Sequence, residues 1–422
     1  MPFHLNVRFP ISRSCAFAFI PNTQRRTSPL QALQDFVDNK TCKFAALIIN
    51  IFKDMNIENN DVDQNRRSDS FLGLNNEEFE PSLPCPISFR NVYKYINRRN
   101  SQPYPIIANL SGNVKPGEML AIMGMSGSGK STLLSTIGGR MTEGVYGQVL
   151  IQRKLFTKRM RPHIAYIWQD DLFYPSSCLS TLDVLMFAAM MKIPSQVPYS
   201  ELQQAVDRAL DQMHLKHCAH TYVSLISGGE KRRLTIAKEL LSRPKVLLVD
   251  EGTSGLDSAA AFDLLTQLKE LAMTDQIPVL AVIHQPSTRA FYLFNTVLML
   301  SEGYCVYRGS PAGCLPYLAS AGFPSPPMEQ ISYNPADFMI DLLYSQELCS
   351  MGNGSGTTTW PRYALIAAWD KRESLLATPH DPSNQDLEAV GECTQPTDMQ
   401  PTSLEMHSPA DPTGSAKSAG RC

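Results

Sequence analysis

The sequence predicts an α/β layered domain with a mainly parallel central sheet. Between about residues 84 and 345, short apolar segments with strand character alternate with helical segments, which is typical of this fold class. Residues 246–249 (VLLV) are the kind of run that a parallel strand carries when both of its faces are buried. Residues 118–123 form another apolar run, which ends at a glycine-rich loop with a helical segment behind it.

The individual elements follow from apolar periodicity and turn signals. Strands are expected at residues 118–123, 164–168, 246–249, 279–283 and 296–300. Helices are expected at residues 130–140, 200–215 and 259–273. Their alternation predicts one ordered domain at residues 84–345.

Two flanks differ from this domain in composition. Residues 1–83 are mixed and end in polar and acidic runs, so we expect a poorly ordered extension. Residues 346–422 are rich in Gly, Ser, Thr, Pro and Asn, and such a tail buries too little apolar surface to offset its ordering entropy. Within the tail, residues 363–376 have helical spacing and are expected to form an isolated helix.

Charge, apolar runs and cysteines exclude several classes of function. A net charge of −2 without a basic stripe argues against nucleic acid as a partner. The apolar runs at residues 16–20 and 44–52 fall short of the ~20 residues that cross a bilayer. The ten cysteines form no Cys-x-x-Cys pair and no zinc-finger spacing with histidine, which favours scattered reduced thiols. The chain by itself is therefore expected to be soluble and cytoplasmic.

The strongest motif is residues 124–131 (GMSGSGKS), which satisfies G-x-x-x-x-G-K-[ST]. Its glycines allow a tight loop of backbone N–H groups, and the following helix directs its positive end at the same point. Lys130 is expected to reach the β and γ phosphates of ATP, and the Ser131 hydroxyl to ligate Mg²⁺. The expected nucleotide contacts are Gly124, Ser126, Gly127, Ser128, Gly129, Lys130, Ser131 and Thr132.

Four polar residues follow predicted strands and complete the expected chemistry. Asp250 is placed to hold the Mg²⁺ shell, and Glu251 to polarise the attacking water as general base. Gln169 is expected to sense the metal or the water, and is therefore also a candidate metal contact. His284 is expected to donate to the γ-phosphate. Taken singly, each would be interpreted as a structural or surface residue; the upstream loop gives them this role.

Residues 226–233 (ISGGEKRR) resemble the signature of ATP-binding cassette (ABC) proteins, and the form with Glu230 and a basic run resembles the G subfamily of half-transporters. At a helix start, Ser227 and the glycines offer hydroxyl and N–H donors. The resemblance implies that these donors contact the γ-phosphate of ATP held by an opposite subunit. The nucleotide contacts it adds are Ser227, Gly228, Gly229 and Glu230.

The resemblance extends over about residues 84–345. Residues 169–171 (QDD), 254–257 (SGLD), 284–287 (HQPS) and 334–338 (NPADF) follow in the family's order, and residues 334–342 look closest to sterol-exporting members. The fold it implies is an ABC nucleotide-binding domain: a P-loop NTPase core, an antiparallel β subdomain near residues 87–152, and a helical subdomain near 170–241. An adenine-stacking aromatic is implied as well, and we assign it to Tyr95, with Tyr93 as the alternative.

The chain departs from the family pattern in three places. Gly252 stands where a proline usually follows the catalytic glutamate, and glycine loosens a turn, so we expect hydrolysis to be less well organised. The family's Thr-Val-Arg-Glu helix start is replaced by residues 180–183 (STLD), which puts coupling to the transport domain in doubt. After residue 338 the family continues into membrane helices, whereas this chain enters a polar tail, as expected of a truncated isoform, an incomplete gene model or an isolated domain.

Three functions follow from the resemblance. The first is the ATPase of a lipid- or sterol-exporting half-transporter, which works at the cytoplasmic face of a membrane as a homo- or heterodimer with composite ATP sites. The second is a truncated, transport-incompetent regulatory partner of a full-length half-transporter. The third, a soluble cassette ATPase of repair or translation, is disfavoured because the chain has neither a second cassette nor a long coiled coil.

Overall fold

The computed structural model describes residues 85–96, 103–169, 179–194, 197–324, 334–345, 349–350 and 358–376. The chain divides into two compact units, Met1–Asp370 and Lys371–Cys422. The fold described below belongs to the first unit. Residues 1–83, where the N-terminal extension was expected, lie outside the described part, as do residue 84 of the predicted domain and residues 377–422 of the tail.

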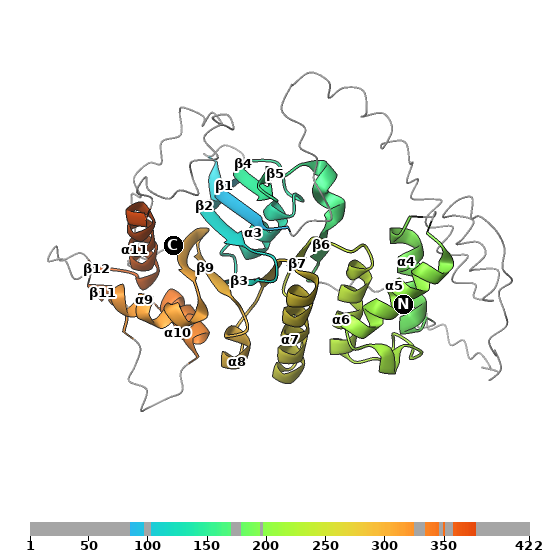
Figure 1. Cartoon of the computed structure of the whole chain (residues 1–422). Helices are drawn as coiled ribbons and strands as arrows, with labels where there is room; N and C mark the ends of the chain where they lie inside the picture. The colour runs from blue at the N-terminus through green and yellow to red at the C-terminus, as the bar shows by residue number, and fades with distance from the viewer. Residues whose placement is uncertain are drawn as a thin grey trace, which may run out of the picture. The chain divides into compact units, whose positions relative to one another are not determined.

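A six-stranded sheet forms the centre of the fold (Figure 1). Its strand order is β10-β9-β3-β8-β7-β6. Strands β9, β3, β8, β7 and β6 are parallel, and β10 runs antiparallel to β9. The strands are β3 (Met119–Gly124), β6 (Ile164–Ile167), β7 (Val246–Val249), β8 (Val279–Val282), β9 (Thr296–Ser301) and β10 (Tyr304–Gly309). Every residue of β3, β6, β7 and β8 is buried, which explains their continuous apolar runs and confirms the predicted parallel sheet.

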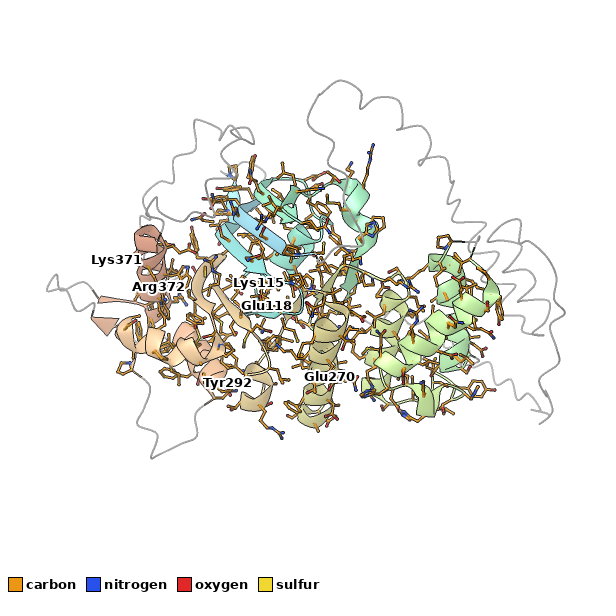
Figure 2. All side chains as sticks on the ribbon, in the orientation of Figure 1. Lys115, Glu118, Glu270, Tyr292, Lys371 and Arg372 are labelled. Carbon is orange, nitrogen blue, oxygen red and sulfur yellow. The ribbon has the colours of Figure 1, made fainter. Side chains whose placement is uncertain are left out.

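A second, antiparallel sheet is formed by strands that come before and after β3 in the sequence, as expected for residues 87–152. Its order is β2-β1-β4-β5, formed by β1 (Ile87–Ile96), β2 (Tyr104–Val114), β4 (Val145–Ile151) and β5 (Lys154–Leu155). The turn from β2 into β3 is closed by Lys115 and Glu118, labelled in Figure 2: the Lys115 N–H donates to Glu118 Oε2 at 3.0 Å, and the Glu118 N–H donates to the Lys115 carbonyl at 3.1 Å. This turn carries the chain from one sheet to the other.

The helices around the parallel sheet begin and end at clear sequence signals. They include α3 (Lys130–Ile137), η3 (Lys158–His163), α7 (Ser258–Asp275), α8 (Thr288–Phe291), η5 (Pro311–Gly313), α9 (Cys314–Ser320) and α10 (Pro335–Tyr344). Helix α3 ends three residues before the predicted limit at residue 140, because Gly138 and Gly139 follow Ile137 and Gly139 takes a positive φ of 64°.

The helical subdomain consists of α4 (Thr181–Lys192), α5 (Tyr199–Gln212), η4 (Lys216–Cys218) and α6 (Gly228–Leu240), and α6 also packs on β6. Residues 170–178 of the expected subdomain lie outside the described part. Helix α4 starts with a complete capping box, in which Ser180 Oγ accepts from the Asp183 N–H at 3.2 Å. The departure at residues 180–183 therefore keeps a well-formed helix start.

The helix expected to stand alone in the tail does not do so. Helix α11 (Pro361–Leu376) buries Leu365, Ile366 and Trp369 in the hydrophobic core of the first unit. The Trp369 ring lies 5.5 Å from the Tyr317 ring and 6.0 Å from the Tyr307 ring, centroid to centroid. The expectation was wrong because it followed the average composition of the tail, whereas this short stretch carries enough apolar surface to pack.

Two further short strands, β11 (Cys349–Ser350) and β12 (Thr358–Thr359), pair with each other ahead of α11. Among the helices of the described residues, none has both the length and the apolar character needed to cross a bilayer.

Candidate functional site

The phosphate loop, residues 124–131, joins β3 to α3. Gly124 and Gly129 both have positive φ, 143° and 95°. A Cβ on Gly124 would lie 2.1 Å from the Leu300 carbonyl oxygen, and a Cβ on Gly129 would lie 3.0 Å from that of Ile106. Only glycine satisfies both the backbone angle and the space at these positions. The sequence thus forms a tight turn that directs backbone N–H groups and the start of α3 toward one point.

Two polar side chains of this loop are buried and face inward. Lys130 is 6% exposed, and its Nζ donates to the carbonyls of Gly124 at 3.0 Å and Met125 at 2.7 Å. Burial lowers the pKa of Lys130, and the nearby charges of Glu251 and Asp250 oppose that shift. Ser128 Oγ is buried and has no hydrogen-bond partner among the described residues. A buried ammonium and an unpaired hydroxyl fit an anionic group such as a polyphosphate.

Ser131 and Asp250, which are predicted to share a metal ion, meet in the structure. Ser131 Oγ donates to Asp250 Oδ1 at 2.8 Å, and the hydroxyl of Tyr166 donates to Asp250 Oδ2 at 3.0 Å. Tyr166 also lies 2.9 Å from Ser135 Oγ, and burial raises the pKa of its hydroxyl. The tyrosine therefore stays protonated and fixes the carboxylate. A hydroxyl and a carboxylate side by side are ligands that suit Mg²⁺.

The remaining predicted residues lie at the same edge of the sheet. Because β3, β8, β7 and β6 are neighbouring parallel strands, the residues after their carboxyl ends share one edge. The register supports this, since Ile122 pairs with Val282, and Val249 with both Ala281 and Ile167. The sheet edge thus carries, in order, the phosphate loop, His284, Asp250 with Glu251, and Gln169. His284 and Gln169 are exposed, and Glu251 is half-buried with a positive φ of 45°.

Arg232 is a residue of this edge that the sequence analysis missed. It is 3% exposed and donates to the carbonyls of Trp168 at 2.7 Å, Asp250 at 3.0 Å and Gly252 at 3.1 Å. One guanidinium on α6 therefore binds the ends of both β6 and β7. The signal was present, because residues 232, 236 and 240 of α6 are buried on one face, so the arginine sits in an apolar stripe.

These contacts also revise the expectation for Gly252. The Gly252 carbonyl is held by Arg232, the residue is buried, and a Cβ at this position would lie 2.5 Å from Val249 Cγ1. The turn after Glu251 is therefore fixed by packing and hydrogen bonding, and the glycine does not loosen it.

The signature turn, residues 226–230, starts α6 with a second capping box. Ser227 N–H and Oγ donate to Glu230 Oε2 at 2.7 and 2.8 Å, and the Glu230 N–H donates to Ser227 Oγ at 3.2 Å. The Ser227 backbone N–H and the bond to His217 lower the pKa of Glu230 to about 2. Ser227 and Gly228 are exposed, and Gly229 is half-buried. The start of α6 is therefore accessible from outside the chain.

The two candidate adenine-stacking residues lie together on β1. The rings of Tyr93 and Tyr95 stack with centroids 6.2 Å apart and planes at 6°, and Tyr146 packs edge-on at 5.8 Å from Tyr95. Tyr95 pairs with Pro105, next to the residue whose carbonyl faces Gly129 of the phosphate loop. Both rings are half-buried. This register places both candidates on one face of a strand close to the loop.

Helix α10 connects two parts of the site. Asn334 Nδ2 donates to the Pro286 carbonyl at 2.7 Å, two residues after His284. At the other end of the helix, the Tyr344 hydroxyl accepts from the Ser126 N–H of the phosphate loop at 3.4 Å. Helix α10 and its N-cap Asn334 thus contact the site at both ends of the helix.

Comparison with known proteins agrees with these features. Residues 107–254 match the family described as ABC transporter. The chain is 38% identical to ABC transporter G family member 14 of Arabidopsis thaliana, over 57% of this chain and 37% of that protein, and 39% identical to member 25, over 58% and 37%. It thus spans little more than a third of the length of these curated relatives.

Among solved structures, cbiO1 from Clostridium perfringens, described as part of the ABC transporter complex cbiONQ, aligns with a TM-score of 0.49 and 24% identity, covering 56% of this chain and 92% of that one. The family match and the identities to G family members show that this chain contains an ABC-type ATPase domain similar to that of G family members.

Proposed function

We propose that this chain binds ATP with Mg²⁺ and hydrolyses it, as the ATPase domain of a G-family half-transporter. The observation that carries the proposal is the 2.8 Å contact between Ser131 Oγ and Asp250 Oδ1 beside the buried Lys130. It joins a hydroxyl from the phosphate loop to a carboxylate from the neighbouring part of the sheet. These are the groups that hold the metal and the β and γ phosphates in phosphate-loop enzymes.

The residues divide into those that hold the nucleotide and those that act on water. Lys130 exchanges its two loop carbonyls for β and γ phosphate oxygens, and Ser128 Oγ gains a partner. Ser131 and Asp250 would hold Mg²⁺, which when bound would supply positive charge to stabilise the transferred phosphoryl group. Glu251 accepts a proton from the attacking water. Gln169 orients that water or the metal, and His284 donates to the γ-phosphate.

Arg232 acts in this proposal as a positioning residue. Its bonds to the carbonyls of Trp168, Asp250 and Gly252 join the residue before Gln169 to both neighbours of Glu251. Since Arg232 belongs to α6, a displacement of the helical subdomain moves the backbone on which Gln169 and Glu251 stand.

A second ABC subunit, identical or different, completes the site in our proposal. The exposure of Ser227 and Gly228 supports it, because a helix start on the outside of one chain can face ATP that another chain holds, although the Ser227 donors would then exchange Glu230 for phosphate oxygens. Symmetric pairing of this kind produces two equivalent composite sites in a homodimer.

We also propose a role for this domain in transport across a membrane. We assign the domain to the cytoplasmic face of a membrane, where it would drive movement of lipid- or sterol-like molecules through a transport domain. The resemblance of residues 334–342 supports the substrate class, and the contacts of α10 with Pro286 and Ser126 support coupling. A movement of the phosphate loop would be transmitted through α10 to the segment that, in the family, continues into the transport domain.

The direct test is ATPase activity of the purified chain, with MgATP, as a function of protein concentration. Composite sites predict a specific activity that rises with concentration at low occupancy. Glu251→Gln should lower turnover by about 100-fold or more while fluorescent ATP analogues still bind. The matched control is Glu270→Gln, an exposed carboxylate on α7 labelled in Figure 2. A Glu251 variant that hydrolyses ATP at the parent rate would refute the assignment of the base.

A further inference from the structure

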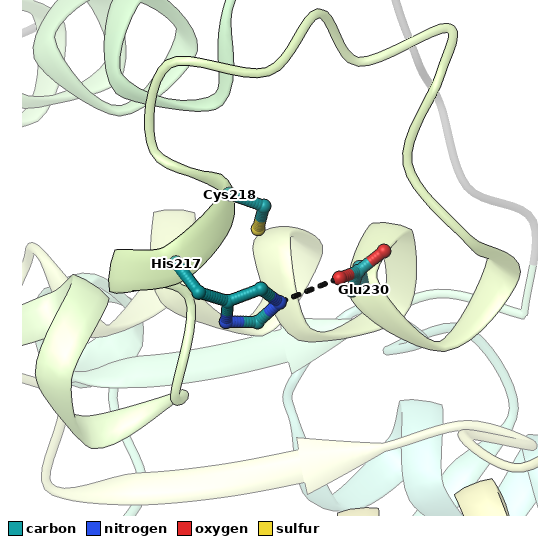
Figure 3. Close-up of side chains that lie close together, drawn as sticks. All are labelled: His217, Cys218 and Glu230. Carbon is teal, nitrogen blue, oxygen red and sulfur yellow. Dashed lines mark hydrogen bonds and ion pairs between the residues drawn. The ribbon is translucent and has the colours of Figure 1, made fainter.

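Three metal-ligating side chains meet beside the signature turn, as Figure 3 shows. His217 and Cys218 come from η4, and Glu230 comes from the first turn of α6. One ligand atom from each lies within 4.8 Å of the other two, and His217 Nε2 is 2.7 Å from Glu230 Oε1. The nucleotide site uses neither His217 nor Cys218. Their spacing is not that of a zinc finger, so the cluster becomes visible only in the fold.

The chemistry of the three groups selects the class of ion. Imidazole nitrogen, thiolate sulfur and carboxylate oxygen are the ligands of Zn²⁺ and similar borderline ions, whereas Mg²⁺ and Ca²⁺ prefer oxygen alone. Tetrahedral Zn²⁺ with bonds of about 2.0–2.3 Å separates its ligand atoms by roughly 3–4 Å. The three ligand atoms lie within 4.8 Å of one another, so side-chain shifts of about 1 Å would bring them to zinc-binding distances without a change in the backbone.

The surroundings leave these atoms available. Glu230 Oε2 accepts both bonds from Ser227, so Oε1 faces the cluster and the capping box survives metal binding. The His217 side chain is 62% exposed, which provides an entry path and room for water as a further ligand. Cys218 is buried directly beneath, with Sγ 3.4 Å from the Leu215 carbonyl. The metal would replace two hydrogen bonds, the one between His217 and Glu230 and the one from the Cys218 thiol to the Leu215 carbonyl, because a thiolate ligand has no proton to donate.

We propose that His217, Cys218 and Glu230 form a binding site for a zinc-class divalent cation, completed by water. The site joins η4 to the first turn of α6, and so it fixes the carboxylate that caps Ser227. Occupancy would hold the signature turn in its capped geometry.

The test is titration of the purified full chain with Co²⁺, which reports a thiolate ligand through near-ultraviolet charge-transfer absorption. We expect one Co²⁺ per chain with this band, its loss in Cys218→Ser, and displacement of Co²⁺ by Zn²⁺ but not by Mg²⁺. His217→Ala, at an exposed position that leaves folding intact, should weaken Co²⁺ affinity by about 10-fold or more. The matched control is His220→Ala, an exposed histidine outside the cluster.

Two results would overturn the site. One is a titration without a charge-transfer band. The other is a band and an affinity that His217→Ala leaves unchanged, which would place the ion on other cysteines and leave His217 and Glu230 as a plain ion pair. The titration contains no nucleotide, so its failure is independent of any failure of the ATPase proposal.

Discussion

Two buried cations, Lys130 and Arg232, are both bonded to main-chain carbonyls, but they differ in where those carbonyls come from. Lys130 donates to carbonyls five and six residues before it, within its own loop. Arg232 donates to carbonyls 18, 20 and 64 residues away, at the ends of two strands. A cation held by its own loop can exchange partners with a ligand at little cost to the fold. A cation that joins distant strands cannot, so we expect the first to act in binding and the second in positioning and stability.

The largest expected effect is the loss of nucleotide binding in Lys130→Ala. Removing a charge-assisted donor to two phosphates should cost about 3 kcal/mol of binding, which is roughly a 100-fold rise in Kd. The melting temperature should change less than in an Arg232 variant, because the carbonyls of Gly124 and Met125 belong to the same loop as Lys130, so their loss of a donor separates no distant strands. Equilibrium binding of a fluorescent ATP analogue and thermal unfolding measure the two quantities, with Lys115→Ala, an exposed lysine, as control. If Lys130→Ala lowered the melting temperature strongly, Lys130 would, like Arg232, contribute to stability and not to binding alone.

Arg232→Met should give the opposite pattern. Methionine keeps an apolar side chain in the core but leaves the carbonyls of Trp168, Asp250 and Gly252 without that donor. Each of these carbonyls that no water reaches should cost about 1–3 kcal/mol of stability. We expect the free energy of unfolding to fall by several kcal/mol, about 3 at least, and kcat to fall more than ATP affinity. Urea unfolding and steady-state kinetics provide both readouts. Arg232→Lys should restore part of the stability yet little of kcat, because one ammonium cannot bind the ends of two strands at once.

The control is Lys231→Ala, which should have the stability and the kcat of the parent. If Lys231→Ala and Arg232→Met lost equal amounts of kcat, Arg232 would not be a positioning residue.

The same contrast explains what could be predicted from the sequence. The parallel sheet, the phosphate loop and the pairing of Ser131 with the carboxylate after β7 follow from contiguous runs such as VLLV at 246–249 and GMSGSGKS at 124–131, because each run specifies its own local geometry. Arg232 and the packing of Trp369 against Tyr307 and Tyr317 were not predictable in this way. They depend on contacts between distant segments, and the polar composition of the basic run and of the tail does not indicate which of their residues are buried.

Gly252 tests whether the turn after Glu251 is fixed by packing. Gly252→Ala introduces a Cβ 2.5 Å from Val249 Cγ1, and overpacking of this kind costs about 1–3 kcal/mol. The shift should displace Glu251 and lower kcat without raising the Kd for ATP. Val249→Ala alone should also destabilise, but the double variant should be more stable than the sum of the two single changes predicts, since it removes the clash. Strict additivity in urea unfolding would mean that the two side chains do not meet, and that the glycine is present for another reason.

The smallest effect concerns the start of α4, where the family pattern is replaced by residues 180–183. Ser180→Ala removes the cap that accepts from the Asp183 N–H at 3.2 Å, and loss of an N-cap costs about 1 kcal/mol. Ser180→Thr should be nearly neutral, because threonine supplies the same oxygen at slightly lower preference, while Ser224→Ala, at an exposed position between helices, is the control. Thermal unfolding should therefore rank the variants as parent, Thr, Ala. If Ser180→Ala left stability unchanged but altered ATPase activity, the segment would act in coupling and not as a helix cap, and its departure from the family pattern would bear on function.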